Sequence, residues 1–148
     1  MKIDLDGRTY FDKKHIVRER EEKSGGIMAI PYLDICEYQG NADWGMIKKM
    51  GVPFVMLRAG YGAGTIDVQF RRNACGCEKE GIPFGVYWLS YAYSPEMAKA
   101  EADYCLETIE EYKIGYPVCI AYTYDSVRYA DSRGMDVTEG WIDAITEA

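Results

Sequence analysis

The side chains on which many catalytic and metal sites depend are scarce in this sequence. Its 148 residues include a single histidine, His15, which lies in a charged stretch. Any Ser-His-Asp or Cys-His catalytic site that does not use His15 is therefore excluded. The five cysteines are scattered without a Cys-x-x-Cys pair, and Cys75-Gly76-Cys77 is too tight for the usual zinc spacing. We expect no metal site, no cofactor, and buried free thiols in a reducing compartment.

Positive charge and long apolar runs are scarce as well. Lysine and arginine number 17 against 24 aspartate and glutamate residues, which gives a net charge of -7. This balance speaks against nucleic acid as a partner, because neutralising phosphates requires clustered cations. No apolar run approaches the roughly 18 residues of a membrane span, so no membrane partner is expected. The opening residues, MKIDLDGRTYFDKK, have no apolar segment after their first charge, which predicts no signal peptide and synthesis in the cytoplasm.

The length and composition predict one globular domain with an amino-terminal extension. Hydrophobic residues make up 48% of the chain, and this length is enough to bury a substantial core. Residues 1–26 differ from the rest: they predict a hairpin over Lys2–Phe11, a charged helix over 13–23 and a linker at Ser24–Gly26. We therefore divide the chain into an extension, 1–26, and a domain, 27–148.

After residue 26, apolar runs and amphipathic stretches alternate four times. The runs that predict strands are 27–36, 53–59, 83–90 and 117–124. The other stretches predict helices over 44–50, 67–79 and 95–109, and a last helix capped by Thr138. This order predicts parallel βα units, and the near-continuous apolar strands agree, because parallel strands are covered on both faces. Gly60–Gly64 has no following Gly-Lys-Ser/Thr, so it predicts a flexible βα loop and not a phosphate-binding loop.

Functional sites in such folds lie at the carboxyl ends of the parallel strands. In this sequence those ends are rich in aromatic and amide side chains and poor in cations. Aromatic faces pack against sugar rings, and amides and arginine donate to hydroxyl and acetamide groups, so we predict a carbohydrate site. The alternative is that many of the 13 tyrosines simply cover the edge of a barrel. The residues at the four strand ends are Asp34, Glu37, Tyr38, Gln39, Arg58, Tyr61, Asp67, Tyr87, Trp88, Ser90, Tyr91, Tyr93, Tyr122, Thr123, Tyr124 and Asp125.

Several blocks of sequence, taken in order, carry a family resemblance. The first is YLDICEYQG at Tyr32–Gly40, followed by Asp43-Trp44. The others are FVMLRAGYG at 54–62, GIPFGVYWLSY at 81–91 and AKAEADY at 98–104. Together they resemble glycoside hydrolase family 25, the muramidases or lysozymes that cut peptidoglycan between N-acetylmuramic acid and N-acetylglucosamine. The resemblance implies an α/β fold over 27–148: a partial TIM-like (β/α) barrel of about four parallel βα units whose partner is a peptidoglycan glycan strand.

The resemblance also implies where catalytic acids stand, and two of them are missing. The opening-strand aspartate of the family matches Asp34. An Asp-x-Glu pair is expected soon after Tyr116-Pro117-Val118, but Ala121 and Thr123 occupy its positions. Glycoside hydrolysis needs one carboxyl group to donate a proton and a second to attack, activate water or orient the substrate, and neither side chain can do this. Asp125, two residues further along the predicted strand, is the candidate stand-in acid.

The length predicts that the barrel is incomplete. A full (β/α) barrel takes roughly 200 residues or more, and four strands leave backbone groups exposed at both edges of the sheet. We expect these edges to be covered by a second copy in a homo-oligomer, by a separate chain that supplies the missing strands, or by the hairpin Lys2–Phe11. In the last arrangement, Asp4 is placed to face the site.

Three functions stay open at this point. The first is a domain that binds peptidoglycan with impaired or absent hydrolysis. The second is an active muramidase completed by a partner chain or by recruited acids such as Asp34, Asp125 or Asp4. The third is a non-catalytic assembly subunit. Action at the bacterial cell wall would follow release from the cell by another route. The residues predicted to contact the substrate are Gln39, Arg58, Tyr61, Tyr87, Tyr91 and Tyr122.

Overall fold

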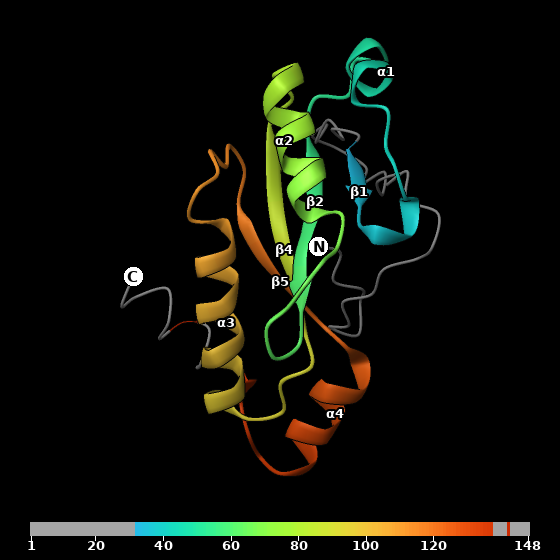
Figure 1. The fold of residues 1–148 in the computed structure, drawn as a ribbon. Helices are drawn as coiled ribbons and strands as arrows, with labels where there is room; N and C mark the ends of the chain where they lie inside the picture. Colours follow the sequence, from blue (N-terminus) through green and yellow to red (C-terminus); the bar gives the residue numbers. More distant parts are fainter. Residues whose placement is uncertain (1–31, 138–141, 143–148) are drawn as a thin grey trace, which may run out of the picture.

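The structure, a computed structural model, describes residues 32–137 and residue 142. The predicted amino-terminal hairpin, charged helix and linker lie outside the described residues, as do the start of the first predicted strand and, apart from Ile142, the last predicted helix. Within the described part, strands and helices alternate along the chain in an α/β fold (Figure 1). This confirms the predicted βα order.

A parallel sheet forms the centre of the fold. Its order is β1-β2-β4-β5, and each neighbouring pair on this path runs parallel. The strands are β1 (Leu33–Ile35), β2 (Val55–Tyr61), β4 (Phe84–Ser90) and β5 (Val118–Tyr122), and the short β3 (Thr65–Ile66) pairs antiparallel to β2. Within residues 32–137, no strand pairs with the outer edge of β1 or β5. Within the described residues the sheet is therefore open, as expected for the predicted partial barrel.

The helices begin and end at local signals that the sequence carries. They are α1 (Trp44–Lys49), α2 (Phe70–Glu80), α3 (Pro95–Ile109), α4 (Tyr124–Ser132) and the short 3-10 helix η1 (Glu37–Gln39). Ser94 caps α3 by accepting a hydrogen bond from the Met97 N–H at 3.3 Å, with Pro95 in the first helical position. Gly81 ends α2 in the left-handed region, with φ of 62°. In the described part of the chain, no helix is both long and apolar enough to cross a membrane.

Side chains of the sheet alternate between two faces with different roles. One face packs against α2 and α3 (Figure 1). It holds five of the largest fully buried side chains: Val55, Leu57, Phe84, Val86 and Trp88. Full burial of each of these contributes roughly 1.5–3 kcal/mol. The register places a different set on the opposite face: Asp34, Met56, Arg58, Tyr87, Cys119 and Ala121. We call this second side of the sheet, the concave side of a barrel, the inner face.

Three aromatic rings stack at the amino-terminal end of the sheet. Phe54 lies between Tyr32 and Tyr116, with ring centres 5.0 and 4.2 Å away and nearly parallel planes. These residues lie just before β1, β2 and β5, so the stack joins the first and last strands of the path. Burial raises the pKa of Tyr32, and the charges of Asp34 and Cys119 raise it further, which places this ring beside the inner face.

The glycine-rich segment is not the flexible loop that the sequence predicts. Gly60 and Tyr61 are the last residues of β2, and a tight turn leads back into β3. The turn is held in place because the Gly62 N–H donates to Leu89 at 3.0 Å and the Trp88 indole donates to the Gly62 carbonyl at 3.1 Å. A side chain at Gly60 would collide with the Trp88 ring. Glycine is therefore needed here for a close approach between strands.

The end of the fourth strand also differs from the prediction. The apolar run 117–124 predicts a strand up to residue 124, but β5 ends at Tyr122 and α4 begins at Tyr124. Thr123 forms the boundary as the N-cap of α4. An uninterrupted apolar run hides such a boundary, because only the capping hydroxyl marks it.

The cysteines are free, as predicted, but they are not all buried. Cys36, Cys77 and Cys105 are buried, Cys119 is partly buried and Cys75 is exposed. Burial raises the pKa of Cys77 and of Cys105 to about 12. These two thiols lie on the apolar faces of α2 and α3, where they pack as small hydrophobic groups.

Replacing Gly76 by alanine tests the contact between α1 and α2. Helix propensity alone favours alanine by about 1 kcal/mol. The new methyl group would overlap the indole ring of Trp44, however, so we expect Gly76→Ala to lower the free energy of unfolding by about 1–3 kcal/mol. Urea denaturation measures the difference, and the neighbouring exposed position provides Cys75→Ala as a control with little effect. Stabilisation by Gly76→Ala would contradict the packing of α1 on α2.

Candidate functional site

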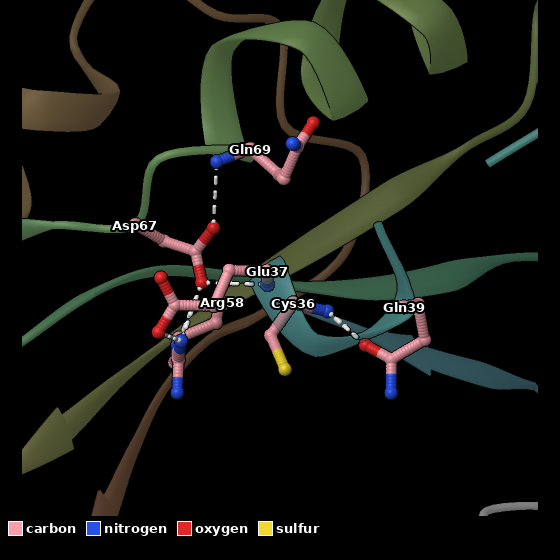
Figure 2. A network of polar contacts seen from close by, with 6 residues as sticks. All are labelled: Cys36, Glu37, Gln39, Arg58, Asp67 and Gln69. Atoms are coloured by element: carbon pink, nitrogen blue, oxygen red, sulfur yellow. Dashed lines mark hydrogen bonds and ion pairs between the residues drawn. The ribbon is translucent and has the colours of Figure 1, made fainter. Parts of the chain in front are cut away.

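Arg58 is the centre of the candidate site. It lies on the inner face of β2 and only 5% of it is exposed. Its Nε donates to Asp67 Oδ2 at 2.8 Å, and its Nη2 lies 2.7 Å from both Glu37 Oε1 and Asp67 Oδ2. Asp67 also accepts the backbone N–H groups of Glu37 at 3.0 Å and Gln69 at 2.9 Å (Figure 2). One arginine thus ties together η1, β2 and the turn before α2.

The charge of Arg58 is stabilised in spite of its burial. Burial by itself lowers the pKa of an arginine, but the hydrogen bond and the charge of Asp67 outweigh this, so the pKa of Arg58 is raised. Two carboxylates surround one guanidinium, which leaves the cluster with an excess of negative charge. Within residues 32–137, no group of three or more His, Cys, Asp or Glu side chains is placed to hold a metal ion.

Two tyrosine rings lie against the guanidinium group of Arg58. The ring centre of Tyr38 is 5.2 Å from Arg58 Cζ, and that of Tyr61 is 5.1 Å away. Both are cation–π contacts. Tyr38 is 81% exposed, and Tyr61 in turn meets the exposed ring of Tyr91, with centres 6.1 Å apart. The ends of β1, β2 and β4 therefore present three tyrosines beside Arg58 and its two carboxylate partners.

Asp34 and Tyr87 pair on the inner face. The Tyr87 hydroxyl donates a hydrogen bond to Asp34, and the pKa of Tyr87 is raised, first by burial and then by the charges of Asp34 and Cys36. The two residues belong to β1 and β4, which are separated by β2. The hydrogen bond orients a carboxylate that is itself only partly buried. The structure thus places two predicted site residues, Asp34 and Tyr87, together.

The two positions at the end of β5 where the resemblance implies acids, Ala121 and Thr123, carry no carboxyl group. Ala121 shares the inner face with Tyr87, because Tyr87 pairs with Cys119 and Leu89 pairs with Ala121. Only 2% of Ala121 is exposed. Thr123 Oγ1 accepts the Ser126 N–H at 3.4 Å and lies 2.5 Å from Ser126 Oγ. The hydroxyl of Thr123 is thus engaged in capping α4.

The prediction that Asp125 continues the strand is wrong. Asp125 lies in the first turn of α4 and is exposed. Helical geometry sets the direction of its side chain, so Asp125 does not share a strand face with Ala121 and Thr123. A carboxylate in the first turn of a helix has a structural role of its own, because it interacts favourably with the helix dipole.

Two other predicted contact residues lie apart from the inner face. Gln39 is exposed at the end of η1, and its Oε1 accepts the Cys36 N–H at 2.7 Å. Tyr122 follows Ala121 in β5, so its side chain points to the opposite face, where burial and the charges of Asp136 and Glu101 raise its pKa. Substrate contact by the six residues named from the sequence stays a prediction.

Sequence reasoning missed the roles of three acidic residues. Glu37 and Asp67 were placed at strand ends but not recognised as the partners of Arg58. Glu101, on α3, is buried; its Oε1 accepts the Tyr91 N–H at 3.1 Å, and it is hydrogen-bonded to Ser90. The available signal for Glu101 was a charged residue on the apolar face of a predicted helix, three positions after Ala98 and four before Cys105.

Comparison with known families decides the identity of this fold. Residues 33–142 match the family described as Glycosyl hydrolases family 25. The chain belongs to glycosyl hydrolase family 25. The match includes Asp34 and extends across Ala121 and Thr123, so this member of the family has no carboxyl group at the two positions where the resemblance implies one.

Solved structures of family 25 enzymes and endolysins share the fold. The modular autolysin LytC from Streptococcus pneumoniae is 26% identical, with a TM-score of 0.65 over 78% of this chain. The catalytic domain of endolysin ply40 from bacteriophage P40 of Listeria monocytogenes is 18% identical, with a TM-score of 0.60 over 83% of this chain and 70% of that one. A family 25 glycosyl hydrolase from Bacillus anthracis is 20% identical, with a TM-score of 0.59 over 79% of this chain and 58% of that one.

The matched region is short beside the first of these relatives. The chain spans 29% of the length of the LytC autolysin. No curated protein matches the chain significantly.

Removing each carboxylate partner of Arg58 in turn tests how much that carboxylate contributes to the stability of the family 25 fold. Asp67→Asn leaves a buried guanidinium without its main partner, so we expect a loss of about 3 kcal/mol in the free energy of unfolding. Glu37→Gln, at a partly exposed partner, is expected to cost about 1 kcal/mol or less. Urea denaturation followed by tryptophan fluorescence measures both. Equal losses in the two variants would contradict the central role of Asp67.

Glu101 is expected to make the stability of the fold depend on pH. Burial raises the pKa of its carboxyl group, while hydrogen bonds from Ser90 and Tyr91 lower it. The folded state therefore holds the proton more tightly than the unfolded chain, whose glutamate pKa is about 4.3. This stabilisation is present below that pH and is lost as the pH rises through the folded pKa. Compared with Glu101→Gln, the native protein should lose stability as the pH rises.

Urea denaturation over a pH series tests this dependence. Glu107→Gln, at an exposed position of α3, is the matched control and should keep the pH profile of the native protein. A Glu101→Gln profile parallel to that of the native protein would show that Glu101 does not titrate with a raised pKa.

Proposed function

We propose that this family 25 domain binds the glycan strands of peptidoglycan and that its hydrolytic activity is impaired or lost in the isolated chain. The observation that carries the proposal lies at the end of β5. Ala121 is buried and offers no functional group, and the hydroxyl of Thr123 caps α4. The LytC autolysin supports the substrate class, because that protein has been solved in complex with a synthetic peptidoglycan ligand.

Hydrolysis of a glycosidic bond needs two carboxyl groups on either side of that bond, separated by roughly 5–9.5 Å. Asp34 supplies one carboxylate on the inner face, where Tyr87 orients it. Among the described strands, the inner face offers Met56, Arg58, Tyr87, Cys119 and Ala121 besides Asp34, and none of these donates a proton as a carboxylic acid does. Glu37 and Asp67 are engaged by Arg58. Asp34 can therefore orient a sugar, and the described strands place no second carboxyl group on the inner face for turnover.

Binding does not require the missing acids. Tyr38, Tyr61 and Tyr91 lie around the end of the sheet, and Arg58 and its carboxylates hold two of them in place. Tyr38 and Tyr91 are exposed and Tyr61 is partly exposed. Such rings, when held in place, provide flat apolar surfaces at low cost in conformational entropy. Because the protein carries a net charge of -7, affinity for an anionic wall would depend on such stacking and on hydrogen bonds, not on overall charge.

A second candidate is an active muramidase completed by another chain. The outer edge of β5, with which no strand of residues 32–137 pairs, favours it, because Tyr116 and Val118 are exposed there. A second copy of this chain or a complementing chain along that edge would cover the unpaired backbone groups and bring further acids. In the related third possibility, a non-catalytic assembly subunit, the edge serves only in pairing.

The proposal predicts binding without clearing. The isolated chain should sediment with insoluble peptidoglycan and leave the turbidity of a cell-wall suspension unchanged. The double variant Ala121→Asp, Thr123→Glu returns a carboxyl group to each position, and any clearing by it would link the loss of activity to these two residues.

Three results would argue against the proposal. Clearing by the native chain that disappears in Asp34→Asn would show an active enzyme. Clearing that appears only after a candidate partner chain is added would favour the completed muramidase. Failure to sediment with peptidoglycan, together with a stable oligomer on size-exclusion chromatography, would favour the assembly subunit.

A further inference from the structure

The segment between β4 and α3 presents two tyrosines on a fixed backbone. The Tyr91 N–H donates to Glu101 Oε1 and the Ala92 N–H donates to Ser90 Oγ, each at 3.1 Å. Ala92 is fully buried, whereas Tyr91 and Tyr93 on either side of it are each 44% exposed. The chain is therefore anchored at Ala92, and both flanking rings remain accessible to solvent.

Tyr93 extends the row of exposed rings towards α4. Its ring centre lies 5.1 Å from that of Tyr129, and the two planes meet at 75°. Tyr129 is 45% exposed, although the next residue, Ala130, is buried and anchors α4 to the core. The two rings thus form a corner on the surface, at the same carboxyl end of the sheet as Tyr61 and Tyr91.

Arg133 lies on the far side of this corner. Its Cζ is 5.1 Å from the ring centre of Tyr129. It is exposed, and neither of the ion pairs seen among the described residues involves it. An exposed guanidinium beside aromatic rings suits a ligand that combines a ring with an anionic group.

We propose that Tyr93, Tyr129 and Arg133 form a second sugar-binding surface for an acidic sugar of the glycan strand. The tyrosines stack against the sugar ring. Arg133 pairs with the carboxylate of N-acetylmuramic acid, which is free where the stem peptide has been removed and which N-acetylglucosamine lacks. This inference rests on the proposed function and adds to it a residue that distinguishes the two sugars. The strand would continue from the rings of Tyr61 and Tyr91 to this surface.

A purely structural role for Arg133 makes a different prediction. Arg133 follows the last turn of α4, where a cation interacts favourably with the helix dipole. That role changes the stability of α4 and affects all ligands alike. A role in binding changes the affinity for acidic sugars alone, so the comparison of two ligands separates the roles.

The test measures calorimetric binding of two peptide-free oligosaccharides of equal length. One alternates N-acetylmuramic acid with N-acetylglucosamine, and the other is the neutral N-acetylglucosamine oligomer. We expect Arg133→Gln to weaken binding of the acidic oligomer about threefold, as for an exposed ion pair, and to leave the neutral one unchanged. Arg128→Gln, which removes a charge from an exposed position of the same helix, is the control and should change neither.

Tyr129 tests the stacking part of the surface. Tyr129→Ala should weaken both oligomers about fivefold, because it removes apolar ring area from the contact. Tyr129→Phe keeps the ring and should bind as the native protein does. Should the alanine variant not fold, the phenylalanine and Arg133→Gln variants still decide the question.

The outcomes separate this inference from the proposed function. If the native chain binds the acidic oligomer and Arg133→Gln binds it equally well, the second surface is refuted and the proposed function stands. The same holds if Arg133→Gln weakens both oligomers to the same extent. If the native chain binds neither these oligomers nor insoluble peptidoglycan, the proposed function and this inference both fail.

Discussion

The buried ion pair between Arg58 and Asp67 is the interaction on which the site depends. It places a charged group where apolar packing would otherwise be expected, and such a pair is stable only when its hydrogen bonds are all provided. Here the backbone N–H groups of Glu37 and Gln69 complete the shell of Asp67. The pair thereby fixes the loops that follow β1 and β2, and with them the tyrosines on either side of the guanidinium. The positions of Tyr38 and Tyr61 at the ends of the strands are therefore a consequence of an ion pair inside the protein.

At the end of β5, a position where the family resemblance implies an acid has a structural role in this chain. Threonine is among the better residues for beginning a helix, because its hydroxyl satisfies a backbone N–H of the first turn. At position 123 it does this for α4. A helix cap favours local stability, whereas catalytic groups are commonly held at some cost to the fold. Asp34 and Tyr87 lie on other strands, β1 and β4, and pair with one another on the inner face.

Much of the fold follows from local sequence signals, whereas the site depends on contacts between distant residues. Apolar runs predicted the four parallel strands, and Ser94-Pro95 and Gly81 predicted helix boundaries, because propensity and capping act over a few residues. The hairpin at Gly60–Ile66 could not be foreseen, since it requires Trp88, more than twenty positions away, to bond the turn. Likewise, nothing local to Arg58 reveals that Glu37 and Asp67 fold around it. The face to which Tyr122 points followed from strand alternation, once the register of β5 was known.

The interior thiols have a consequence for how opening of this domain can be followed. Cys77 and Cys105 are buried against the sheet with pKa values of about 12, so near neutrality almost no reactive thiolate forms at either position. Cys75 is exposed and lies on α2 together with Cys77, next to Gly76, which contacts Trp44. An alkylating reagent will thus modify Cys75 in the folded protein. It will reach Cys77 and Cys105 only when α2 and α3 separate from the sheet. The rate at which Cys77 and Cys105 are modified therefore reports this opening, and the modification of Cys75 serves as the internal reference.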